Sequence, residues 1–174
     1  IPASFVARPE QNRGTECGRL EDRVQSGRMK SATHICHIGE GVEIPEHAVA
    51  VHEQDIRDAA SATLIAELKP DAVVHLAAQM DVRKSVEDPV YDASVNILGT
   101  LNLLEAVRKH SPKTRVVFAS TGGALYGDNT TPPNFEDTKK DPESPYAVSK
   151  LTVEYYMAYY GRVHGLDTVA TRFG

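Results

Sequence analysis

The sequence predicts an α/β fold built on a doubly wound parallel sheet. From about residue 48 onward, short apolar runs alternate with stretches in which apolar residues recur at helical spacing. The runs at residues 71–78 and 115–119 are continuously apolar, which is typical of strands buried on both faces of a parallel sheet. Strands that alternate with helices form right-handed βαβ units, and such units build a doubly wound sheet.

The first predicted elements follow this alternation closely. Residues 48–55 (AVAVHEQD) predict a short strand that runs into a polar turn, and residues 59–68 predict a helix that ends before Pro70. Residues 71–78 (DAVVHLAA) predict the next strand. A long helix follows Pro89, and one apolar stripe is expected along it, formed by Val95, Leu98, Leu101, Leu104 and Val107.

The second half of the chain repeats the pattern. Residues 115–119 (RVVFA) predict a buried strand. Ser144 is a good N-cap and Pro145 suits the first helical position, so a helix is expected to begin there. Gly165 ends that helix, and residues 168–173 open one more strand. Ligands bind such sheets outside the carboxyl ends of the strands, which directs attention to the segments that follow each strand.

The first 45 residues have a different character. They contain no convincing apolar strand, and none is predicted there. Gly14, Gly18 and Gly27 lack the G-x-G-x-x-G or G-x-x-G-x-x-G spacing that places backbone N–H groups against a pyrophosphate. A glycine-rich phosphate loop is therefore missing from the sequence.

Composition narrows the functional classes. The 174 residues suit one domain, and a 41% hydrophobic and 25% charged composition is that of a globular protein in water. The net charge of −5 argues against nucleic acid, and neither a membrane span nor a signal peptide is predicted. Two cysteines, Cys17 and Cys36, make no disulfide framework, so the cytoplasm is expected. His34, Cys36 and His37 have no second ligand pair, so no metal site is predicted.

Tyr146 and Lys150 are the residues best suited to acid–base chemistry. They stand at i and i+4 near the start of a predicted helix, so they share one face. An ammonium beside a phenol favours the phenolate, so we expect Lys150 to lower the Tyr146 pKa and make it a base for a sugar hydroxyl. Thr121 lies just past a strand end, where its hydroxyl is placed to donate to the same oxygen.

Two features near the strand ends have two interpretations each. Asp55 either offers its carboxylate to an adenine amino group or caps the helix that follows. Gly122 and Gly123 either make room for a ligand or form a tight turn. The sequence leaves both questions open.

Six segments, in this order, resemble the extended short-chain dehydrogenase/reductases, the NAD-dependent epimerase/dehydratase family, and within it the UDP-glucose 4-epimerases. They are DIRD from Asp55, VVHLAAQ ending at Gln79, VNILGTLNLLEA from Val95, FASTGGALYG from Phe118, SPYAVSK ending at Lys150, and TRFG at the end. The resemblance implies a Rossmann-like NAD-binding domain. It also implies that Tyr146 is the catalytic base, that Lys150 holds the nicotinamide ribose, and that Thr121 takes the family's Ser/Thr place, with Ser120 as the less favoured neighbour.

The resemblance also implies cofactor contacts. Asp55 and Ile56 would meet the adenine, and the pyrophosphate and ribose side would be lined by Leu76, Ala77, Ala78 and Gln79. Asn96 would support the active-site backbone, although a purely structural buried amide is an equally open interpretation.

Residues 1–174 would then be a partial NAD-binding domain, with residues 1–45 matching poorly, residues 46–174 matching well, and the C-terminal substrate domain absent. In that alignment residue 1 falls inside the phosphate loop, and Glu21 or Asp22 would bind ribose.

The implied function is a nucleotide-sugar 4-epimerase that acts on a UDP-sugar as a homodimer. A nucleotide-sugar 4,6-dehydratase, or another NAD-dependent sugar-nucleotide reductase, is the enzymatic alternative. Dehydratases of the family place Asp and Glu directly after the Thr, where this chain has Gly122 and Gly123. A non-catalytic dinucleotide-binding protein is the other alternative.

Overall fold

The computed structural model describes residues 4–7, 32–35, 49–52, 54–128, 130–131 and 133–173. These residues form a six-stranded sheet in the order β3-β2-β1-β4-β5-β6. The strands are β1 Ser4–Ala7, β2 Ala32–Ile35, β3 Val49–Val51, β4 Ala72–His75, β5 Arg115–Thr121 and β6 Thr168–Phe173. This spatial order is that of the doubly wound dinucleotide-binding sheet, so the predicted fold class is confirmed.

Five of the six strands run in one direction. The pairs β2–β3, β4–β5 and β5–β6 are parallel. Strand β1 is antiparallel to both of its neighbours, β2 and β4, so those two are parallel to each other. The four strands predicted from the apolar runs, β3, β4, β5 and β6, therefore point the same way, as expected.

Strands β1 and β2 correct one prediction. They lie in the first 45 residues, for which no strand was expected. Each has only four residues, SFVA and ATHI, which is too short for an alternating or apolar pattern to stand out. Backbone hydrogen bonds to the neighbouring strands, rather than local strand propensity, stabilise β1 and β2. The reversed direction of β1 is also a departure from the all-parallel sheet.

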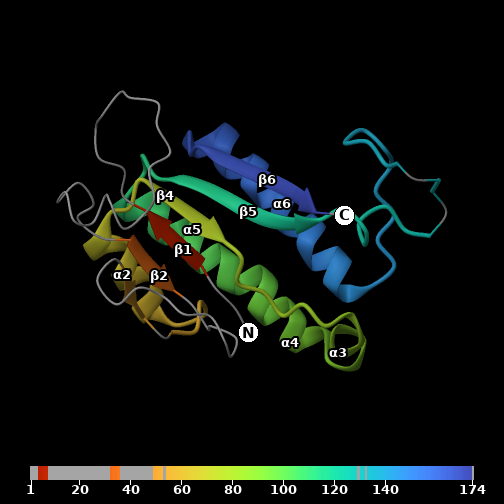
Figure 1. Ribbon diagram of the computed structural model, residues 1–174, viewed down its shortest axis with the longest axis horizontal. Coiled ribbons are helices and arrows are strands. Elements are labelled where there is room, and N and C mark those ends of the chain that lie inside the picture. The colour runs from red at the N-terminus through yellow and green to blue at the C-terminus, as the bar shows by residue number, and fades with distance from the viewer. Residues whose placement is uncertain are drawn as a thin grey trace.

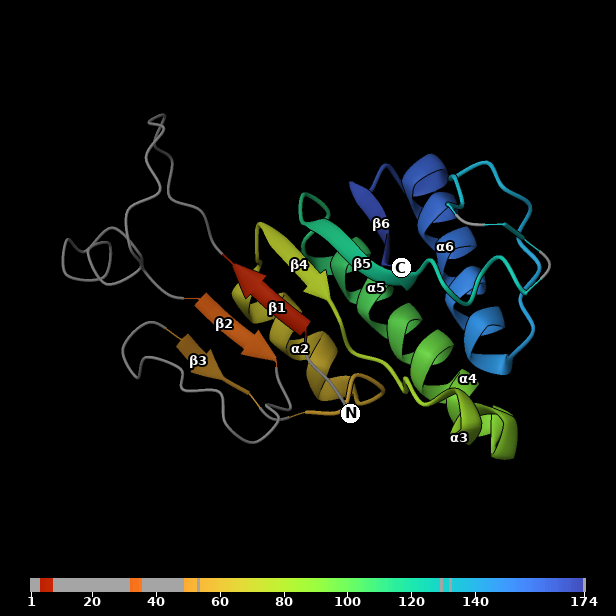
Figure 2. The same ribbon diagram turned by 45° about the vertical axis from the view of Figure 1, so that its right-hand side comes forward.

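The described helices cover one face of the sheet. They are α2 Ala59–Leu68, α3 Val82–Glu87, α4 Pro89–Ala93, the π-helical turn η1 Ser94–Leu98, α5 Gly99–His110 and α6 Pro145–His164. Figures 1 and 2 show α2, α5 and α6 side by side behind the strands, while no described helix lies over the opposite face. The caps of α6 are as predicted: Ser144 Oγ accepts from Ala147 N, and Gly165 has a φ of 69°.

The π-helical turn explains one error in the predicted apolar stripe. Leu98 was expected to be buried, but it is 61% exposed, whereas Leu103 is buried. A π-turn adds one residue to a helical turn, which shifts the phase of the side chains that follow. The long helix after Pro89 is therefore three consecutive segments. Val95, Leu104 and Val107 of the predicted stripe are buried on either side of Leu98.

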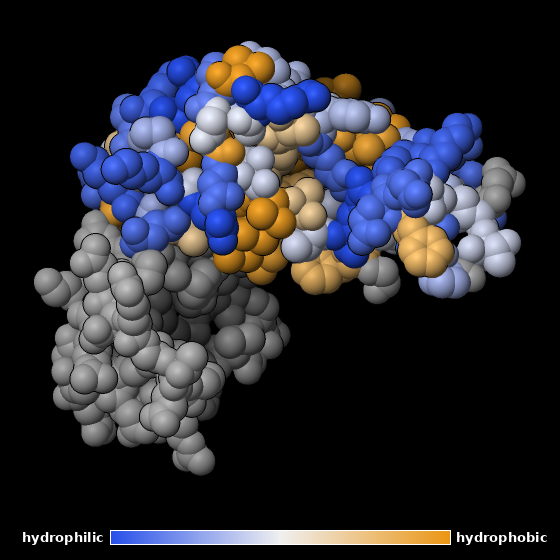
Figure 3. All heavy atoms as spheres, turned by 90° about the horizontal axis from the view of Figure 1, so that it is seen from above, coloured by the Kyte–Doolittle hydropathy of each residue, from blue (hydrophilic) through white to orange (hydrophobic). Residues whose placement is uncertain are grey.

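One core joins the helices to the sheet. It is formed by buried residues of α2, β4, α5, β5 and α6, together with the turn before β6: Leu64, Ile65, Val73, Leu103, Leu104, Ala106, Val107, Val116, Phe118, Val153, Met157, Tyr160 and Leu166. No helix in the part of the chain that the structure describes is long and apolar enough to span a bilayer. On the side seen in Figure 3, apolar side chains form small groups between charged ones.

His75 is a buried polar member of β4. Its Nε2 lies 2.8 Å from Thr100 Oγ1, and that hydroxyl donates to Asn96 O. Because the hydroxyl proton is already used, His75 Nε2 carries the proton and donates to Thr100. Burial, and secondly the Lys150 charge, lower the His75 pKa to about 3, so the ring is neutral in the fold.

We expect this neutral histidine to make the chain acid-sensitive. The unfolded state takes up the proton near pH 6.5 and the folded state only near 3, so stability falls as the pH drops below 6.5. His75→Gln keeps a donor for Thr100 but does not titrate. Between pH 7 and pH 5 the unfolding free energy of the wild type should fall by about 2 kcal/mol relative to that of His75→Gln. Urea denaturation at both pH values measures this change. Parallel pH curves for the two proteins would contradict this assignment.

Candidate active site

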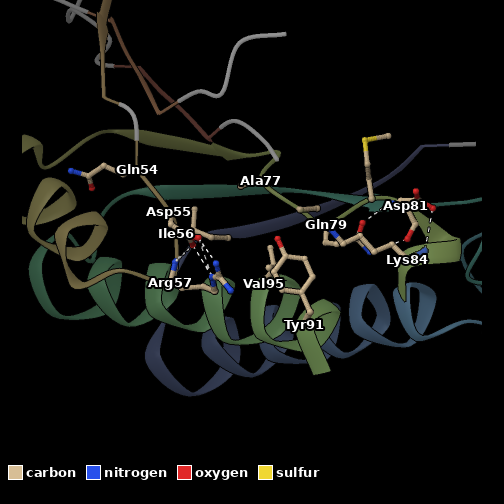
Figure 4. Close-up of a pocket in the computed structure, with 12 residues that line it drawn as sticks. Gln54, Asp55, Ile56, Arg57, Ala77, Gln79, Asp81, Lys84, Tyr91 and Val95 are labelled. Atoms are coloured by element: carbon tan, nitrogen blue, oxygen red, sulfur yellow. Dashed lines mark hydrogen bonds and ion pairs between the residues drawn. The ribbon is translucent and has the colours of Figure 1, made fainter. Parts of the chain in front are cut away.

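A cavity of about 300 Å³ opens at the carboxyl edge of the sheet, where β3 and β4 end. Its lining comes from the turn after β3, the loop after β4, α3, α4 and η1: Gln54, Asp55, Ile56, Arg57, Ala77, Ala78, Gln79, Met80, Asp81, Lys84, Tyr91 and Val95 (Figure 4). Five of the predicted cofactor-binding residues are among them. Leu76 is not, and its side chain is 44% exposed.

Asp55 is held in the turn after β3 by Arg57. Asp55 Oδ1 accepts from Arg57 N and Nε, both at 2.9 Å. These hydrogen bonds outweigh partial burial and lower the Asp55 pKa. Asp55 does not cap α2, because the N-cap position is occupied by Asp58, whose backbone N donates to Asp55 O. The helix-cap interpretation of Asp55 is therefore wrong, while a contact with adenine stays a prediction.

Two cations and an aromatic ring line the cavity beside Asp55. The Tyr91 ring centre lies 5.5 Å from Arg57 Cζ and 4.8 Å from Lys84 Nζ, so the ring contacts both positive side chains. Figure 4 shows Tyr91 between the Asp55–Arg57 turn and the Gln79–Asp81 loop. Sequence reasoning missed this group because Arg57 and Tyr91 are far apart in the chain and meet only when the sheet forms.

The loop after β4 is fastened by Asn96. Gln79 N donates to Asn96 Oδ1 at 2.8 Å, and Asn96 Nδ2 donates back to Gln79 O at 2.9 Å. Asn96 is buried and does not line the cavity. Asn96 is therefore a buried structural amide, and the backbone that it holds belongs to a residue that lines the cavity. A structural role and a supporting role are compatible here.

Helix α6 brings Lys150 under the end of β5. The Lys150 side chain is 3% exposed, and its Nζ donates to Ala119 O at 2.8 Å. The same Nζ lies 4.6 Å from the Phe118 ring centre and 5.7 Å from that of Tyr146. Burial lowers the Lys150 pKa to about 8, against the opposing effect of the Asp92 carboxylate. The predicted pair is therefore half-enclosed between α6 and β5.

The pKa of Tyr146 departs from the prediction. It is raised, first by burial of the phenol and then by the Asp92 carboxylate. The expected lowering by Lys150 is wrong for the chain alone, because the Lys150 ammonium is directed to Ala119 O. The sequence showed the spacing of Tyr146 and Lys150 but not the buried carboxylate beside them.

Thr121 and Ser120 have different surroundings. Ser120 is buried, and its Oγ donates to Glu154 Oε1 at 2.6 Å, in a group where Glu154 also pairs with Arg172 at 2.6 Å. Thr121 ends β5 half-buried, and its Oγ1 accepts from Ala124 N at 3.4 Å. Of the two hydroxyls, that of Thr121 is better placed for a ligand. Neither Thr121 nor the Tyr146–Lys150 pair lines the cavity itself.

Some predicted residues lie outside the described part of the chain. Cys36, His37, Glu21 and Asp22 are among them, and of His34 only the backbone in β2 is described. Within the described ranges, no group of three His, Cys, Asp or Glu side chains is placed to hold a metal ion.

The family of GDP-mannose 4,6 dehydratases matches residues 12–174 of this chain. The chain belongs to this family of NAD-dependent epimerases and dehydratases. It is 44% identical over 113 residues to a UDP-glucose 4-epimerase of Mycolicibacterium smegmatis, covering 65% of this chain and 36% of the relative. It is 35% identical over 165 residues to the GDP-mannose 4,6-dehydratase of Vibrio cholerae, covering 94% and 44%.

Solved structures agree with this family. The chain superposes on the Thermus thermophilus UDP-glucose 4-epimerase in complex with NAD with a TM-score of 0.73 and 38% identity, covering 89% of this chain and 50% of that one. The Thermotoga maritima UDP-glucose 4-epimerase with UDP-glucose gives 0.72 and 34%, with 88% and 50% covered. The chain spans about two fifths of the length of the curated relatives it matches.

We expect Asn96→Ala to destabilise the chain by about 2–4 kcal/mol, because it leaves the buried Gln79 N–H and C=O without partners. Asn102→Ala is the matched control. Its side-chain amide donates to Ile56 O and Asp58 O in more exposed surroundings, where water can replace it, so about 1 kcal/mol or less is expected. Urea denaturation measures both, and equal losses would show that Asn96 has no special part in holding the loop.

Proposed function

We propose that this chain is the NAD-binding part of a nucleotide-sugar 4-epimerase that oxidises the substrate transiently at C4. The observation that carries the proposal is the buried Lys150, placed by α6 under the end of β5 with Tyr146 one helical turn away. Relatives whose names specify UDP-glucose 4-epimerase activity support it. The substrate we propose is a UDP-sugar.

The described residues fit an NAD molecule at its adenosine end. Ala77 and Ala78 line the cavity with side chains too small to fill it, and Asn96 fixes the next residue, Gln79. We propose that Asp55 and Ile56 meet the adenine, that residues 76–79 line the ribose and pyrophosphate, and that Lys150 holds the nicotinamide ribose. When bound, NAD supplies a reversible hydride acceptor.

In this proposal Tyr146 takes the proton from the sugar 4-hydroxyl as C4 loses hydride, and Thr121 donates a hydrogen bond to the same oxygen. Burial and Asp92 raise the Tyr146 pKa, so the phenol needs a positive charge beside it before it can act as a base near neutral pH. Lys150, one turn away, supplies that charge when its Nζ turns from Ala119 O toward the phenol.

A 4,6-dehydratase is the alternative that the relatives leave open. Elimination of water requires a further acid and base after Thr121, where this chain has Gly122 and Gly123. A Cβ at Gly123 would meet nothing within 4 Å, so packing does not demand glycine there. The absence of acidic side chains after Thr121 thus removes groups that a dehydratase needs, and it favours epimerisation. A non-catalytic dinucleotide-binding protein would have no need of a buried lysine beside Tyr146.

We also propose that the protein pairs as a homodimer through α5 and α6. Apolar or aromatic side chains remain exposed on α6 and on η1, which leads directly into α5: Leu98, Val148, Tyr155, Tyr156, Tyr159 and Val163. Several of those on α6 recur at helical spacing, so they form a stripe along it that a second copy would cover.

We expect the 174-residue chain to bind NAD weakly, with a Kd of about 1 mM or weaker, because its sequence lacks the glycine-rich loop whose N–H groups hold a pyrophosphate. Amide shifts in an NMR titration with NAD should map to the cavity. Asp55→Ala should weaken them, while Asp58→Ala, an exposed neighbour outside the cavity lining, should not. Tight, stoichiometric binding in a calorimetric titration would show that the N-terminal segment holds the cofactor after all.

We expect Tyr146→Phe to lower kcat about 10²-fold or more, because it removes only the hydroxyl that carries the proton. The assay is turnover of UDP-galactose by a chimera in which segments of the Thermus thermophilus epimerase extend this chain at both ends. Tyr160→Phe is the control and should leave kcat unchanged, because the Tyr160 hydroxyl, further along the same helix, donates to Glu105 outside the site.

Two further variants belong to the same experiment. Lys150→Ala should lower kcat and weaken NAD binding, and Thr121→Val should cost less than Tyr146→Phe. The lower limb of the pH–rate profile should lie well below the ordinary tyrosine pKa of about 10, and Lys150→Ala should move it to higher pH. Near-normal turnover by Tyr146→Phe would rule out the proposed base.

A further inference from the structure

Asp92 is a fully buried carboxylate that joins three parts of the fold. Its Oδ1 accepts from Gln79 Nε2 at 3.1 Å and from Asn96 Nδ2 at 2.9 Å, and its Oδ2 accepts from Ser149 Oγ at 2.6 Å. These donors stand on the loop after β4, on η1 and on α6. One side chain of α4 therefore links the cavity wall to the helix that carries the Tyr146–Lys150 pair.

A second bond holds the same end of α6. Tyr146 N, one of the first N–H groups of the helix, donates to Ser85 Oγ of α3 at 3.2 Å. Together with the Asp92–Ser149 bond, it fixes the first turn and a half of α6 against α3 and α4. The position of the pair relative to the cavity thus depends on these two contacts.

Hydrogen bonding alone does not explain a carboxylate at this place. All three donors to Asp92 are neutral, two amides and a hydroxyl. An asparagine could accept from both amides and donate to the hydroxyl, and it would avoid the cost of burying a negative charge. A buried carboxylate in such surroundings indicates that its negative charge has a function besides hydrogen bonding.

The Asp92 charge acts on the proposed catalytic pair of α6. Other titratable groups on the elements around Asp92 include His75 on β4, Asp81 in the following loop, Lys84 on α3 and Tyr91 on α4. His75 is neutral, Asp81 caps α3, and Lys84 lies over the Tyr91 ring. The Asp92 carboxylate raises the pKa of Tyr146 and also raises that of Lys150 against the effect of burial.

We propose that Asp92 is a positioning residue for the Tyr146–Lys150 pair: its carboxylate bonds the cavity loop and η1 to the first turns of α6, and so places a fixed negative charge beside the helix start that carries both side chains. The inference rests on the proposed function, in which Tyr146 and Lys150 act on the substrate and the cofactor. A protonated Lys150 is the form that binds ribose hydroxyls and supplies positive charge to the phenol. A neutral Tyr146 takes up its task only when that charge turns toward it.

The test is the pair of side-chain titrations in the 174-residue chain without ligands. Asp92→Asn removes the charge and keeps a side chain of the same shape with partners for Gln79, Asn96 and Ser149. The pKa of Tyr146 and that of Lys150 should both fall, as followed by NMR with ¹³C-labelled tyrosine and lysine and assigned with Tyr146→Phe and Lys150→Arg. Asp88→Asn is the matched control, because Asp88 is an exposed carboxylate that caps the same helix, and it should move neither pKa.

A second variant tests the mechanical part. Ser149→Ala removes the bond to α6 and leaves the Asp92 charge in place. Amide hydrogen exchange at the start of α6 should become at least several-fold faster, with both pKa values still higher than in Asp92→Asn. If Asp92→Asn fails to fold, this exchange measurement decides the proposal by itself.

The proposal is overturned if Asp92→Asn leaves both titrations at their wild-type values, if Asp88→Asn shifts them equally, or if Ser149→Ala leaves the exchange unchanged. None of these measurements uses NAD or turnover, so the outcome is independent of the proposed function. If the extended chimera were inactive, the epimerase proposal would be contradicted, and the titrations would still test the role of Asp92.

Discussion

Buried polar groups must find partners inside the protein, and this requirement shapes the carboxyl edge of the sheet. The loop after β4 lies between the sheet and the helices, where Gln79 cannot depend on water. Asn96 satisfies its backbone, and Asp92 accepts from its side chain. Because Asp92 also accepts from Ser149, the same solution that satisfies the loop sets the position of α6. The cavity and the Tyr146–Lys150 pair are therefore parts of one hydrogen-bonded unit.

The opposite end of this unit is β5. Lys150 donates to the Ala119 carbonyl, while one residue further Ser120 donates to Glu154, which pairs with Arg172 of β6. Two side chains of α6 one helical turn apart, Lys150 and Glu154, thus bond to successive residues of β5. Glu154 keeps a lowered pKa because the hydrogen bonds from Arg172 and Ser120 outweigh its burial. The strand end is held by charged groups from two sides, which suits a site that must keep its geometry while a ligand binds.

Electrostatics distinguishes the two halves of the site. At the cavity, Arg57 and Lys84 both contact the Tyr91 ring, and Arg57 forms an ion pair with Asp55. At the pair, burial disfavours the charged form of both side chains. The Asp92 carboxylate opposes this effect at Lys150, whose pKa is still lowered to about 8, and adds to it at Tyr146. The site without ligands is thus a cation beside a neutral phenol.

The sequence by itself determined the elements whose signals are local. The bounds of α2, the caps of α6, the strands β4 and β5 and the shared face of Tyr146 and Lys150 follow from periodicity and capping, because these depend on residues a few positions apart. Full burial of β4 and β5 on both faces was predicted as well, but burial alternates along both strands. Only the tertiary structure decided the direction of β1, the phase shift at η1, the placing of Arg57 against Tyr91 and the role of Asp92. Each of these depends on groups distant in the chain, or on burial that exists only after packing. The raised pKa of Tyr146 is the clearest case, since spacing shows which lysine is near but not which carboxylate is buried beside it.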